Sequence, residues 1–566
     1  MSEELNTKTT EVLSEEGRAK IMVCAGTGCQ SSGSLEVFNR LQEEIDALDE
    51  NIEVGLLSDN GNEVINEVEV EISGCHGFCD EGPLVRIDPM GILYTHVEVD
   101  NVESIVEDTL KHGKLAEDLC YKSADGTLYA KEDDIPFYKG QRRLVLGNLG
   151  QIDPESIESY EKAGGYNALE KALTNMTPEE VWNEILEAGL RGRGGAGFPT
   201  GRKWQFAYEE DADPKYVIAN CDEGDPGAFM DRSLTEGDPH RVIEGISIAG
   251  YAIEATKGFI YVRAEYPLAV KRVNKAIDDA YENGYLGKDV FGSGFDFDLE
   301  VKRGAGAFVC GEETALISSI EGKAGRPEPR PPYPAQSGLY GQPTVINNVE
   351  TLGNVPMIIR NGPNWYSSIG SENSPGTKTF AITGDVANTG LIEVPMGITM
   401  REIIYDVAGG LDSDRNFKAV QIGGPSGGCL PEEHLDIPLG FDSLQEVGAM
   451  VGSGGLVVMD ENSCMVNVAK FFLNFIQDES CGKCTPCRDG TKRMLEILER
   501  LTEGEAKPKD LDRLEELSHY VKESSLCGLG QTAPNPVLST LRYFRDEYEA
   551  HLEGRCPTGV CFHHDR

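Results

Sequence analysis

The chain is poor in positive charge. Its 566 residues include 51 lysines and arginines against 96 aspartates and glutamates, a formal net charge of −45 at pH 7. Proteins that bind nucleic acid use Lys and Arg to neutralise phosphates. This balance therefore argues against a nucleic-acid partner, and the acidic surface is best explained as one that keeps the protein in solution.

Long apolar runs are absent as well. No stretch approaches the ~18 apolar residues of a membrane span, and the polar, acidic start from Met1 to Arg18 resembles neither a signal peptide nor a transit peptide. No internal repeat is visible. We expect a soluble, cytoplasmic protein with several domains of about 100–200 residues each.

Cysteine, by contrast, is plentiful, with 15 in the chain. In an intracellular protein this number favours metal or redox chemistry over disulfides. Near the start lie Cys24, Cys29, Cys75 and Cys79; further on lie Cys481, Cys484, Cys487 and Cys527; Cys556 and Cys561 come last. The single cysteines are expected to be small buried hydrophobes: Cys120, Cys221, Cys310, Cys429 and Cys464.

The second cysteine group carries the strongest signal. The stretch Glu479-Ser-Cys-Gly-Lys-Cys-Thr-Pro-Cys-Arg-Asp-Gly490 has C-x2-C-x2-C spacing, and Cys527 follows downstream. This spacing can direct three thiolates to neighbouring corners of one inorganic core, which a distant fourth thiolate completes. We interpret it as an iron–sulfur site, with zinc as the alternative.

Hydrophobic patterns divide the chain into regions. Residues 1–18 are expected to be a flexible N-terminus, and 19–120 a small α/β unit with strands near 20–23, 54–57 and 68–72 and a helix from about Ser34. Both of its cysteine pairs are expected on loops at strand ends. Residues 121–165 are expected to be a linker and entry segment.

Residues 166–365 alternate strands and helices in α/β order. Thr177-Pro-Glu-Glu180 is a capping box that opens a helix ending near Gly189. Residues 366–457 are expected to be a β-grasp-like (SLBB) module with a helix near 400–407. Residues 458–553 are expected to form a four-helix bundle from helices near 465–478, 489–502, 509–523 and 536–553. Residues 554–566 form a Cys/His tail.

Two glycine-rich segments suit phosphate or nucleotide binding. The run from Arg191 to Trp204 lets backbone N–H groups approach a phosphate, with Arg and Lys adding charge; the alternative is a tight turn. The segment Gly304–Ala315 joins a strand to a helix start through a glycine turn, as nucleotide sites do. Its Glu312 and Glu313 would otherwise merely offset the helix dipole.

Two polar segments follow apolar strands. Asn220-Cys-Asp-Glu-Gly-Asp-Pro-Gly227 suits ribose hydroxyls or a ring edge, with an acidic turn as the alternative. Thr344-Val-Ile-Asn-Asn-Val-Glu-Thr351 places two amides side by side, able to donate and accept towards a flavin.

These four segments, followed in order by the cysteine motif, resemble the NADH-binding flavoprotein subunit of respiratory complex I. They also resemble its soluble relatives, the diaphorase subunits of NAD-linked hydrogenases and formate dehydrogenases. The resemblance covers about residues 140–550. The N-terminal unit resembles the thioredoxin-like ferredoxin module of the same systems. The implied fold is multidomain α/β: a thioredoxin-like ferredoxin domain, a Rossmann-like FMN/NAD domain, the β-grasp-like module, and the helical bundle with its cluster.

Carried onto this sequence, the resemblance implies particular site residues. The implied FMN site consists of Gly192, Gly194, Lys203, Asn220, Asp222, Glu223, Gly311, Glu312, Asn347, Asn348 and Thr351. The implied NAD(H) site consists of Phe198, Lys203, Phe206, Asp225 and Glu313, where many relatives have Glu in place of Asp225. The [4Fe–4S] ligands would be Cys481, Cys484, Cys487 and Cys527, and the [2Fe–2S] ligands Cys24, Cys29, Cys75 and Cys79.

The tail offers one further metal site. Relatives often carry a two-cluster ferredoxin domain after the bundle, and none is expected here. His551, Cys556 and Cys561 have H-x4-C-x4-C spacing, and Cys464 could complete a Cys3His zinc site. His563 and His564 are alternatives to His551, and two free thiols on a frayed tail are the alternative to a site.

A flavin exchanges electron pairs with NAD(H) and single electrons with iron–sulfur clusters. The resemblance therefore implies an NAD(H):acceptor oxidoreductase subunit, without a catalytic acid or base. Its partners would be a hydrogenase or dehydrogenase catalytic subunit, a small [2Fe–2S] subunit and ferredoxin. NADH is favoured over NADPH because the acidic loop offers no obvious cation for a 2′-phosphate.

The leading hypothesis is a flavin-based electron-bifurcating hydrogenase or transhydrogenase. A second is a non-bifurcating diaphorase of formate dehydrogenase or hydrogenase. A third, of another class, is a redox-inactive, zinc-stapled scaffold.

Overall fold

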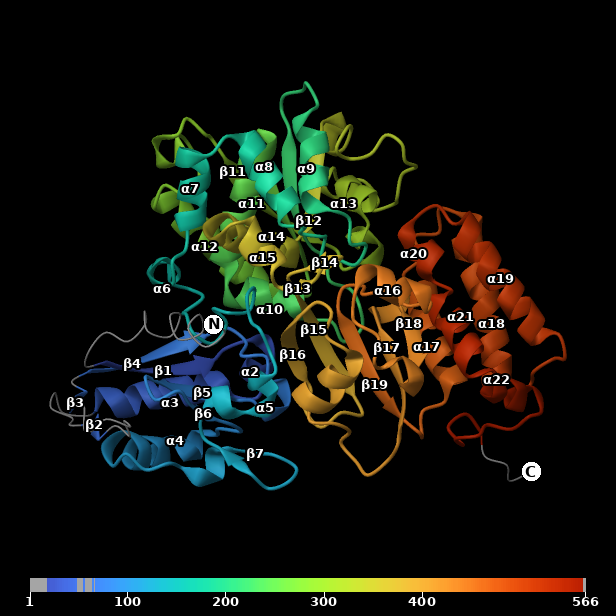
Figure 1. Cartoon of the computed structure of the whole chain (residues 1–566), viewed down its shortest axis with the longest axis horizontal. Helices are drawn as coiled ribbons and strands as arrows, with labels where there is room; N and C mark the ends of the chain where they lie inside the picture. The colour runs from blue at the N-terminus through green and yellow to red at the C-terminus, as the bar shows by residue number, and fades with distance from the viewer. Residues whose placement is uncertain (1–17, 48–53, 56–63, 66, 563–566) are drawn as a thin grey trace.

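The computed structural model describes residues 18–47, 54–55, 64–65 and 67–562. Expectations for residues 1–17, for 56–57 and for His563 and His564 lie outside this range. Figure 1 shows the N-terminal unit at lower left, a sheet covered by helices above it, a second sheet at the centre, and a group of helices at the right.

The N-terminal unit is built on a four-stranded sheet in the order β4-β1-β5-β6. Its strands are β1 (Arg18–Cys24), β4 (Glu67–Ser73), β5 (Val85–Asp88) and β6 (Ile92–Tyr94), with a short hairpin of β2 (Val54–Gly55) and β3 (Val64–Ile65). β1 runs parallel to β4 and antiparallel to β5. Helix α3 (Ser34–Asp46) buries Val37 and Leu41.

The expectation that both cysteine pairs lie on loops is wrong for Cys29 and for Cys79, which begins a short 3-10 helix (Cys79–Glu81). Cys29 lies in a short helix, α2 (Thr27–Ser31), which begins three residues after the end of β1. Cys24 is the last residue of β1, and Cys75 follows β4. Within this helix the Cys29 side chain is buried.

The segment 121–165 is packed rather than merely connecting. Its elements are β7 (Tyr121–Lys122), β8 (Leu128–Tyr129), α5 (Pro136–Lys139) and α6 (Ile157–Lys162). Phe137 stacks on Phe78 of the N-terminal unit with ring centroids 4.3 Å apart. The buried Glu393 accepts backbone hydrogen bonds from Leu144, Val145 and Leu146. The segment thus fastens the N-terminal unit to the centre of the molecule.

The upper sheet has four parallel strands in the order β11-β10-β9-β12. They are β9 (Tyr216–Cys221), β10 (Lys257–Arg263), β11 (Asp298–Gly304) and β12 (Thr344–Asn348). Numbered along the chain, this is the order 3-2-1-4 with which doubly wound sheets begin. The strand order reverses between β9 and β12, and in such sheets ligands bind outside the carboxyl ends of the strands at that reversal.

Both faces of this sheet are buried, as parallel sheets require. One face packs Val217, Ile260 and Val345 into a core with helices α11 and α14. The helices of this region are α7 (Asn167–Asn175), α8 (Pro178–Glu187), α9 (Thr200–Tyr208), α10 (Met230–Gly237), α11 (Pro239–Ile253), α12 (Pro267–Glu282), α13 (Glu313–Ile320), α14 (Val349–Asn361) and α15 (Pro363–Ser367). The predicted capping box of Thr177 and Glu180 is present at the start of α8.

The opposite face of the sheet packs against the C-terminal helices. Ile218, Tyr261 and Ile346 share a core with Ile476 and with Cys487 of the cysteine motif. The iron–sulfur motif therefore lies directly against the sheet whose strand ends form the reversal.

The central sheet has five strands in the order β16-β15-β19-β17-β18. They are β15 (Thr377–Gly384), β16 (Gly390–Pro395), β17 (Phe417–Ile422), β18 (Gly428–Pro431) and β19 (Gly455–Asp460), with a small hairpin of β13 (Gly370–Ser371) and β14 (Ser374–Pro375) nearby. β15 and β19 are parallel and the other neighbours antiparallel. The helix expected near 400–407 is a π-helix, Glu402–Val407, and α16 (Phe441–Glu446) follows.

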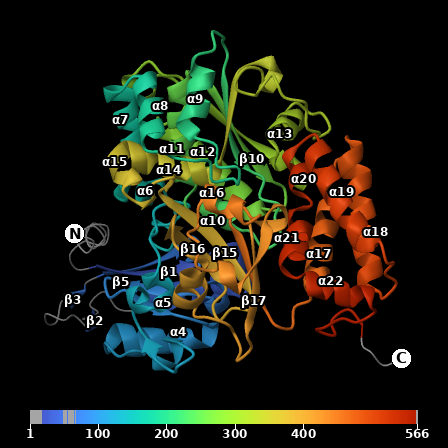
Figure 2. The same ribbon diagram turned by 45° about the vertical axis from the view of Figure 1, so that its right-hand side comes forward.

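The C-terminal region is helical, as Figure 2 shows beside the central sheet. Its helices are α17 (Met465–Asp478), α18 (Thr491–Thr502), α19 (Asp510–Ser524), α20 (Gly528–Thr532), α21 (Asn535–Tyr543) and α22 (Arg545–Leu552). The expectation of a single helix over 536–553 is wrong. The helix is interrupted at Phe544, whose φ is −130° and ψ 38°, so the chain forms α21 and α22 instead. The break lets the buried hydroxyls of Thr540 and Tyr548 bond at 2.7 Å.

Among the described residues, no helix is long and apolar enough to cross a bilayer.

Candidate flavin, dinucleotide and metal sites

The loops that follow β9 and β11 meet at the carboxyl ends of the sheet. Asn220, in β9, donates through Nδ2 to the carbonyl of Gly311 at 3.0 Å. Its Oδ1 accepts from the backbone N–H of Asp222 at 2.9 Å. One amide therefore holds the acidic loop and the glycine turn together.

The glycine run packs against the end of β12. A Cβ on Gly194 would lie 3.0 Å from Cβ of Asn348, so glycine allows a closer approach here than other residues would make easily. Trp204 donates to Oδ1 of Asn347 at 2.8 Å, and the N–H of Arg193 donates to Oγ1 of Thr351 at 2.8 Å. All four segments singled out in the sequence thus converge at the reversal of strand order.

Asp222 is the most exceptional group at this point. It is 8% exposed, and neither carboxylate oxygen has a hydrogen-bond partner within the described part of the chain. Burial raises the pKa of Asp222 to about 7, against the opposing effect of Arg263. A buried acceptor without a partner is costly. It suits a ligand that brings its own donors, such as a flavin ring N–H or a ribityl hydroxyl.

Glu313 sits among cations. It pairs with Lys203 and, at 3.2 Å, with Arg330. Burial alone would raise its pKa, but Lys203 and Arg330 hold it below the ordinary value. Glu312 caps α13, accepting from the N–H groups of Thr314 and Ala315 at 3.0 Å each. An ionised carboxylate here can accept hydrogen bonds from ribose hydroxyls.

The two phenylalanines of the implied dinucleotide site are exposed. Phe198 is 46% and Phe206 43% exposed. Phe206 has the Arg202 guanidinium 5.4 Å from its ring centroid. Exposed rings beside a nucleotide-type turn are available for stacking on a base or nicotinamide.

Several predicted ligands already have internal partners. Glu223 accepts from the N–H groups of Asp231 and Arg232 at 3.1 Å each, at the start of α10. Asn348 caps α14 through Oδ1, and its Nδ2 donates to Asp231 at 2.6 Å. Through these hydrogen bonds, Glu223 and Asn348 fix the starts of α10 and α14 beside the site. Gly192 donates its N–H to the carbonyl of Phe198 at 2.9 Å, which closes the glycine loop.

Two basic residues of the glycine run, Arg191 and Arg193, have partners within the protein. Arg193 is 1% exposed, and its guanidinium donates to the carbonyls of Thr377 and Pro375 and to the Tyr366 hydroxyl. Arg191 lies over the Phe441 ring, 4.5 Å from its centroid. A buried guanidinium group needs several acceptors, and β14 and the start of β15 supply them to Arg193.

Asp225 is also directed towards the central sheet. Its carboxylate accepts from the Ser453 hydroxyl and lies beside Gly424. Burial raises its pKa to about 6. The structure therefore does not join Asp225 to the Lys203–Glu313 pair.

The four cysteines of the strongest motif surround one cavity. It is lined by Cys481, Cys484, Cys487 and Cys527 together with Val309, Pro327, Ser480, Lys483, Leu526 and Leu529. Burial raises the pKa of Cys487 to about 11 and also raises that of Cys527. Four thiols converging on a mostly apolar cavity fit a cluster that would take them as thiolates.

Glu479 is a residue whose role the sequence did not reveal. Its Oε2 accepts from the backbone N–H of Phe308 at 2.8 Å. It ties the cysteine motif to the glycine turn that follows β11. In the sequence, Glu479 is marked only by its position two residues before Cys481. That position does not identify a partner 171 residues away.

The N-terminal cysteines also converge. Hydrogen bonds from the thiols of Cys24 and Cys79 hold the pKa of Cys75 well below its usual range. Thr27 donates its N–H to Glu236 of α10 at 3.0 Å. A Cβ on Gly74 would lie 2.3 Å from the Cα of Gly237, so the two backbones touch. This cysteine site is docked on α10, the helix whose start is held by Glu223.

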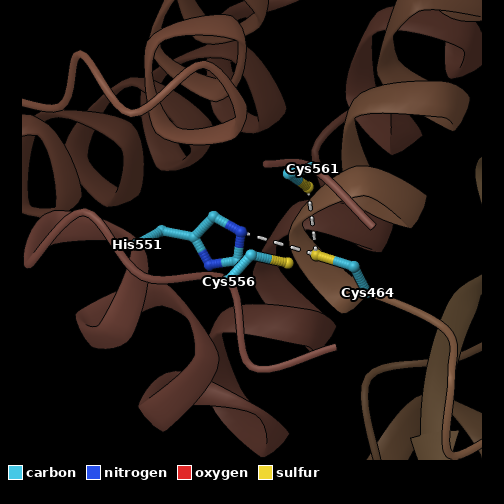
Figure 3. Close-up of side chains that lie close together, drawn as sticks. All are labelled: Cys464, His551, Cys556 and Cys561. Carbon is cyan, nitrogen blue, oxygen red and sulfur yellow. Dashed lines mark hydrogen bonds between the residues drawn. The ribbon is translucent and has the colours of Figure 1, made fainter. Parts of the chain in front are cut away.

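A third group forms at the tail. Figure 3 shows Cys464, His551, Cys556 and Cys561 converging, and their ligand atoms all lie within 4.8 Å of one another. Nε2 of His551 is 3.6 Å from the Cys464 sulfur, and the Cys561 sulfur is 3.5 Å from that same sulfur.

The four side chains influence one another's protonation. Nδ1 of His551 lies 2.7 Å from the carbonyl of Glu547, so an N–H there leaves Nε2 as the free ligand atom. Hydrogen bonds from Cys561 and His551 lower the pKa of Cys464 to about 4. Burial opposes the charged imidazole, but the Cys464 bond raises the pKa of His551 to about 9.

Comparison with known proteins agrees with this geometry. Residues 185–357 match the Nuo51 FMN-binding domain, 467–551 the iron–sulfur binding region of NADH-ubiquinone oxidoreductase-F, and 12–110 the thioredoxin-like [2Fe–2S] ferredoxin family. The NADP-reducing hydrogenase subunit HndC of Solidesulfovibrio fructosivorans is 59% identical over 424 residues, covering 75% of this chain and 86% of its own length. The second F-type NADH-quinone oxidoreductase subunit of Rhizobium meliloti (strain 1021) is 47% identical over 415 residues, covering 73% and 99%.

A solved structure matches nearly the whole chain. The NAD+-reducing [NiFe]-hydrogenase in its H2-reduced state superposes with a TM-score of 0.65 at 31% identity, covering 96% of this chain and 87% of the other. Fold and sites therefore define a flavin- and iron–sulfur-dependent oxidoreductase subunit. The chain belongs to the family of the NADH-quinone oxidoreductase F subunits and their hydrogenase counterparts. This confirms the resemblance, including the thioredoxin-like domain and the flavin domain.

Proposed function

We propose that the chain exchanges a hydride between NAD(H) and FMN and passes single electrons through its clusters to partner subunits. The observation that carries this proposal is the convergence of Asn220, Asp222 and Gly311 at the sheet reversal, with the four-cysteine cavity packed against the same sheet. When bound, FMN would supply the exchange between paired and single electrons.

The side chains would then bind and orient rather than transfer protons. Asp222 would accept hydrogen bonds from the flavin, and Gly194 and Gly311 would let the backbone approach it. Glu313, kept ionised by Lys203, would hold ribose hydroxyls. Phe198 and Phe206 would stack on the dinucleotide rings. The remaining implied FMN and NAD(H) residues belong to the same proposal. Asp225 is the exception, because its carboxylate contacts Ser453 of the central sheet region.

The proposed partners are the subunits that take electrons from the two clusters. We propose that Cys481, Cys484, Cys487 and Cys527 hold the [4Fe–4S] cluster and Cys24, Cys29, Cys75 and Cys79 the [2Fe–2S] cluster. Electrons would leave for a hydrogenase or dehydrogenase catalytic subunit or a small [2Fe–2S] subunit. If the complex is electron-bifurcating, its reaction requires reduced ferredoxin along with NADH. If the intact complex is fully active with NADH alone, the bifurcating hypothesis is wrong and the non-bifurcating diaphorase hypothesis stands.

The test uses the purified, anaerobic chain. Adding NADH should bleach the flavin absorbance and produce the EPR signal of a reduced [4Fe–4S] cluster. Glu313→Gln should raise the KM for NADH about tenfold, the loss of one charged hydrogen bond. Glu300→Gln, a change at an exposed glutamate of β11, should leave KM unchanged. A chain that purifies without flavin or iron–sulfur absorbance would support the scaffold hypothesis.

We further propose that Cys464, His551, Cys556 and Cys561 bind one zinc ion. The supporting observation is their mutual distance, within 4.8 Å, which suits four ligands around one ion. Glu547 supports the site: its carbonyl faces His551, and its carboxylate accepts from the Met465 N–H and pairs with Lys418 at 2.6 Å. The ion would join the start of α17 to α22 and the tail.

The predicted domain boundaries remain part of this proposal, with ends near 120, 165, 365, 457 and 553. We assign the five-stranded sheet to a β-grasp-like fold because a strand hairpin and parallel β15 and β19 are present. The helical region is proposed as a four-helix bundle of α17, α18, α19 and α21.

A further inference from the structure

The segment Pro327–Arg330, called here the 327–330 clasp, contacts the cysteine motif at one end. Lys483 lies between Cys481 and Cys484, and its Nζ donates to the carbonyl of Pro327 at 2.7 Å. The same ammonium pairs with the Glu328 carboxylate at 2.9 Å. Pro327 and Lys483 both line the four-cysteine cavity. The clasp thereby fixes a positive charge beside the cavity.

At its other end the clasp contacts two carboxylates, Glu312 of the implied FMN site and Glu313 of the implied NAD(H) site. Arg330 pairs with Glu312 at 2.5 Å and with Glu313 at 3.2 Å. Between these ends, the N–H of Glu328 donates to Oγ1 of Thr314 at 2.8 Å. Four consecutive residues therefore span from the cysteine loop to the two carboxylates at the start of α13.

The clasp is stiff. Its sequence, Arg326-Pro-Glu-Pro-Arg-Pro-Pro332, has proline at every second position and then two in succession. Each proline ring fixes φ and leaves few ways to absorb a displacement within the segment. A shift of Arg330 is therefore expected to move Pro327, and with it the Lys483 ammonium.

We propose that the clasp couples the dinucleotide site to the [4Fe–4S] cluster, with Lys483 and Arg330 as positioning residues. The inference rests on the proposed function. A cluster with four thiolates is anionic and gains one negative charge on reduction, so a nearby cation favours the reduced form. A nucleotide at Glu313 competes for the carboxylate that holds Arg330. Such coupling is reciprocal, so cluster reduction and nucleotide binding must alter each other by the same factor.

The experiment is an EPR-monitored redox titration of the whole, cofactor-loaded chain with and without saturating ADP-ribose, which occupies the site but cannot carry a hydride. Without nucleotide, Lys483→Met should lower the equilibrium constant for cluster reduction about tenfold, or about 59 mV. In the unaltered protein ADP-ribose should shift the midpoint. In Lys483→Met and Arg330→Ala that shift should fall to less than half.

Lys323→Met is the matched control, because it removes a lysine of the same loop whose ion pair is with Glu321, outside the clasp. It should leave the shift unchanged, and Arg330→Lys should restore part of it. An equal shift in all variants, or none in the unaltered protein, overturns the coupling while the proposed function stands. A chain that lacks the cluster or fails to bind ADP-ribose overturns both.

Discussion

The candidate flavin site and the four-cysteine cavity differ from the tail site in how their ionisable groups are partnered. At the flavin site, Asp222 has no hydrogen-bond partner among the described residues, and in the four-cysteine cavity burial raises the pKa of Cys487 to about 11. In the tail, the groups pair with one another: the pKa of Cys464 falls to about 4 and that of His551 rises to about 9. The thiols around the Cys481–Cys527 cavity leave space between them, whereas the four tail ligand atoms lie within 4.8 Å of one another. The comparison separates a cavity that suits a bulky cluster from a compact site that suits one ion.

The largest expected effect comes from removing one cluster ligand. Cys484→Ser should abolish the [4Fe–4S] EPR signal and slow NADH-driven reduction of a one-electron acceptor at least ~100-fold, because a ligand matters at least as much as its supporting shell. Zinc content should stay unchanged, since the tail site is separate. Cys120→Ser, at a cysteine outside all three groups, is the control. Loss of zinc in the Cys484 variant would contradict the separation.

Removing one ligand of the tail site is the complementary test. Cys561→Ser should release the zinc and destabilise the C-terminal helices by roughly 3 kcal/mol or more, because metal binding and folding are coupled. Hydrogen exchange at α17 and α22 amides measures this loss. Flavin and iron contents should not change. A variant that keeps its zinc, or a parent protein without any, would show that the four ligands form no metal site.

The buried Asp222 carboxyl should give the opposite pH response from a paired carboxylate. The pKa of Asp222, about 7, lies above the ordinary value of about 3.9, so the folded protein binds this proton more tightly than the unfolded chain. The flavin-free protein should therefore lose stability as pH rises from about 4 to about 7. Asp222→Asn should remove that loss, gaining roughly 2 kcal/mol at pH 8 and little at pH 4.

Urea unfolding across pH measures this effect, and Asp118→Asn at an exposed site is the control. Equal pH profiles for the parent and Asp222→Asn proteins would count against a buried, unpartnered carboxylate. FMN affinity should fall in the Asp222 variant despite its greater stability.

The smallest expected effect concerns the docking of the N-terminal cysteines. Thr27→Val removes the hydroxyl bond to Glu236 and should weaken the contact with α10 by about 1 kcal/mol. Hydrogen exchange in residues 18–47 should rise about fivefold, whereas exposed Thr174→Val should have no effect there. An unchanged exchange rate would mean that the glycine contact alone holds this unit.

Local chemistry made much of the fold and site predictable. The strands around Ile218 and Ile260 are short apolar runs, the capping box of Thr177 needs only four residues, and cysteine spacing identified all three groups. The family resemblance implied that Asn220 and Gly311 share a site, and their positions at the ends of parallel strands explain how they meet.

Long-range packing made the rest unpredictable. Arg193, within a glycine run, suggests a phosphate ligand, yet its acceptor Thr377 lies 184 residues away. Glu479 has its partner in another region, and the break at Phe544 depends on how Tyr548 packs on Thr540. Cys29 lies in α2, whose first residue, Thr27, bonds to Glu236 209 residues away, a contact that no local pattern encodes.

Metal analysis of the intact, anaerobically purified chain tests the central claim most directly. Native mass spectrometry with elemental analysis should find one FMN, one [4Fe–4S] cluster, one [2Fe–2S] cluster and one zinc ion per chain, with zinc alone lost from Cys561→Ser and the [4Fe–4S] cluster alone lost from Cys484→Ser. Iron in the tail site, or zinc in the Cys481–Cys527 cavity, would contradict the distinction between cavity sites and the compact site.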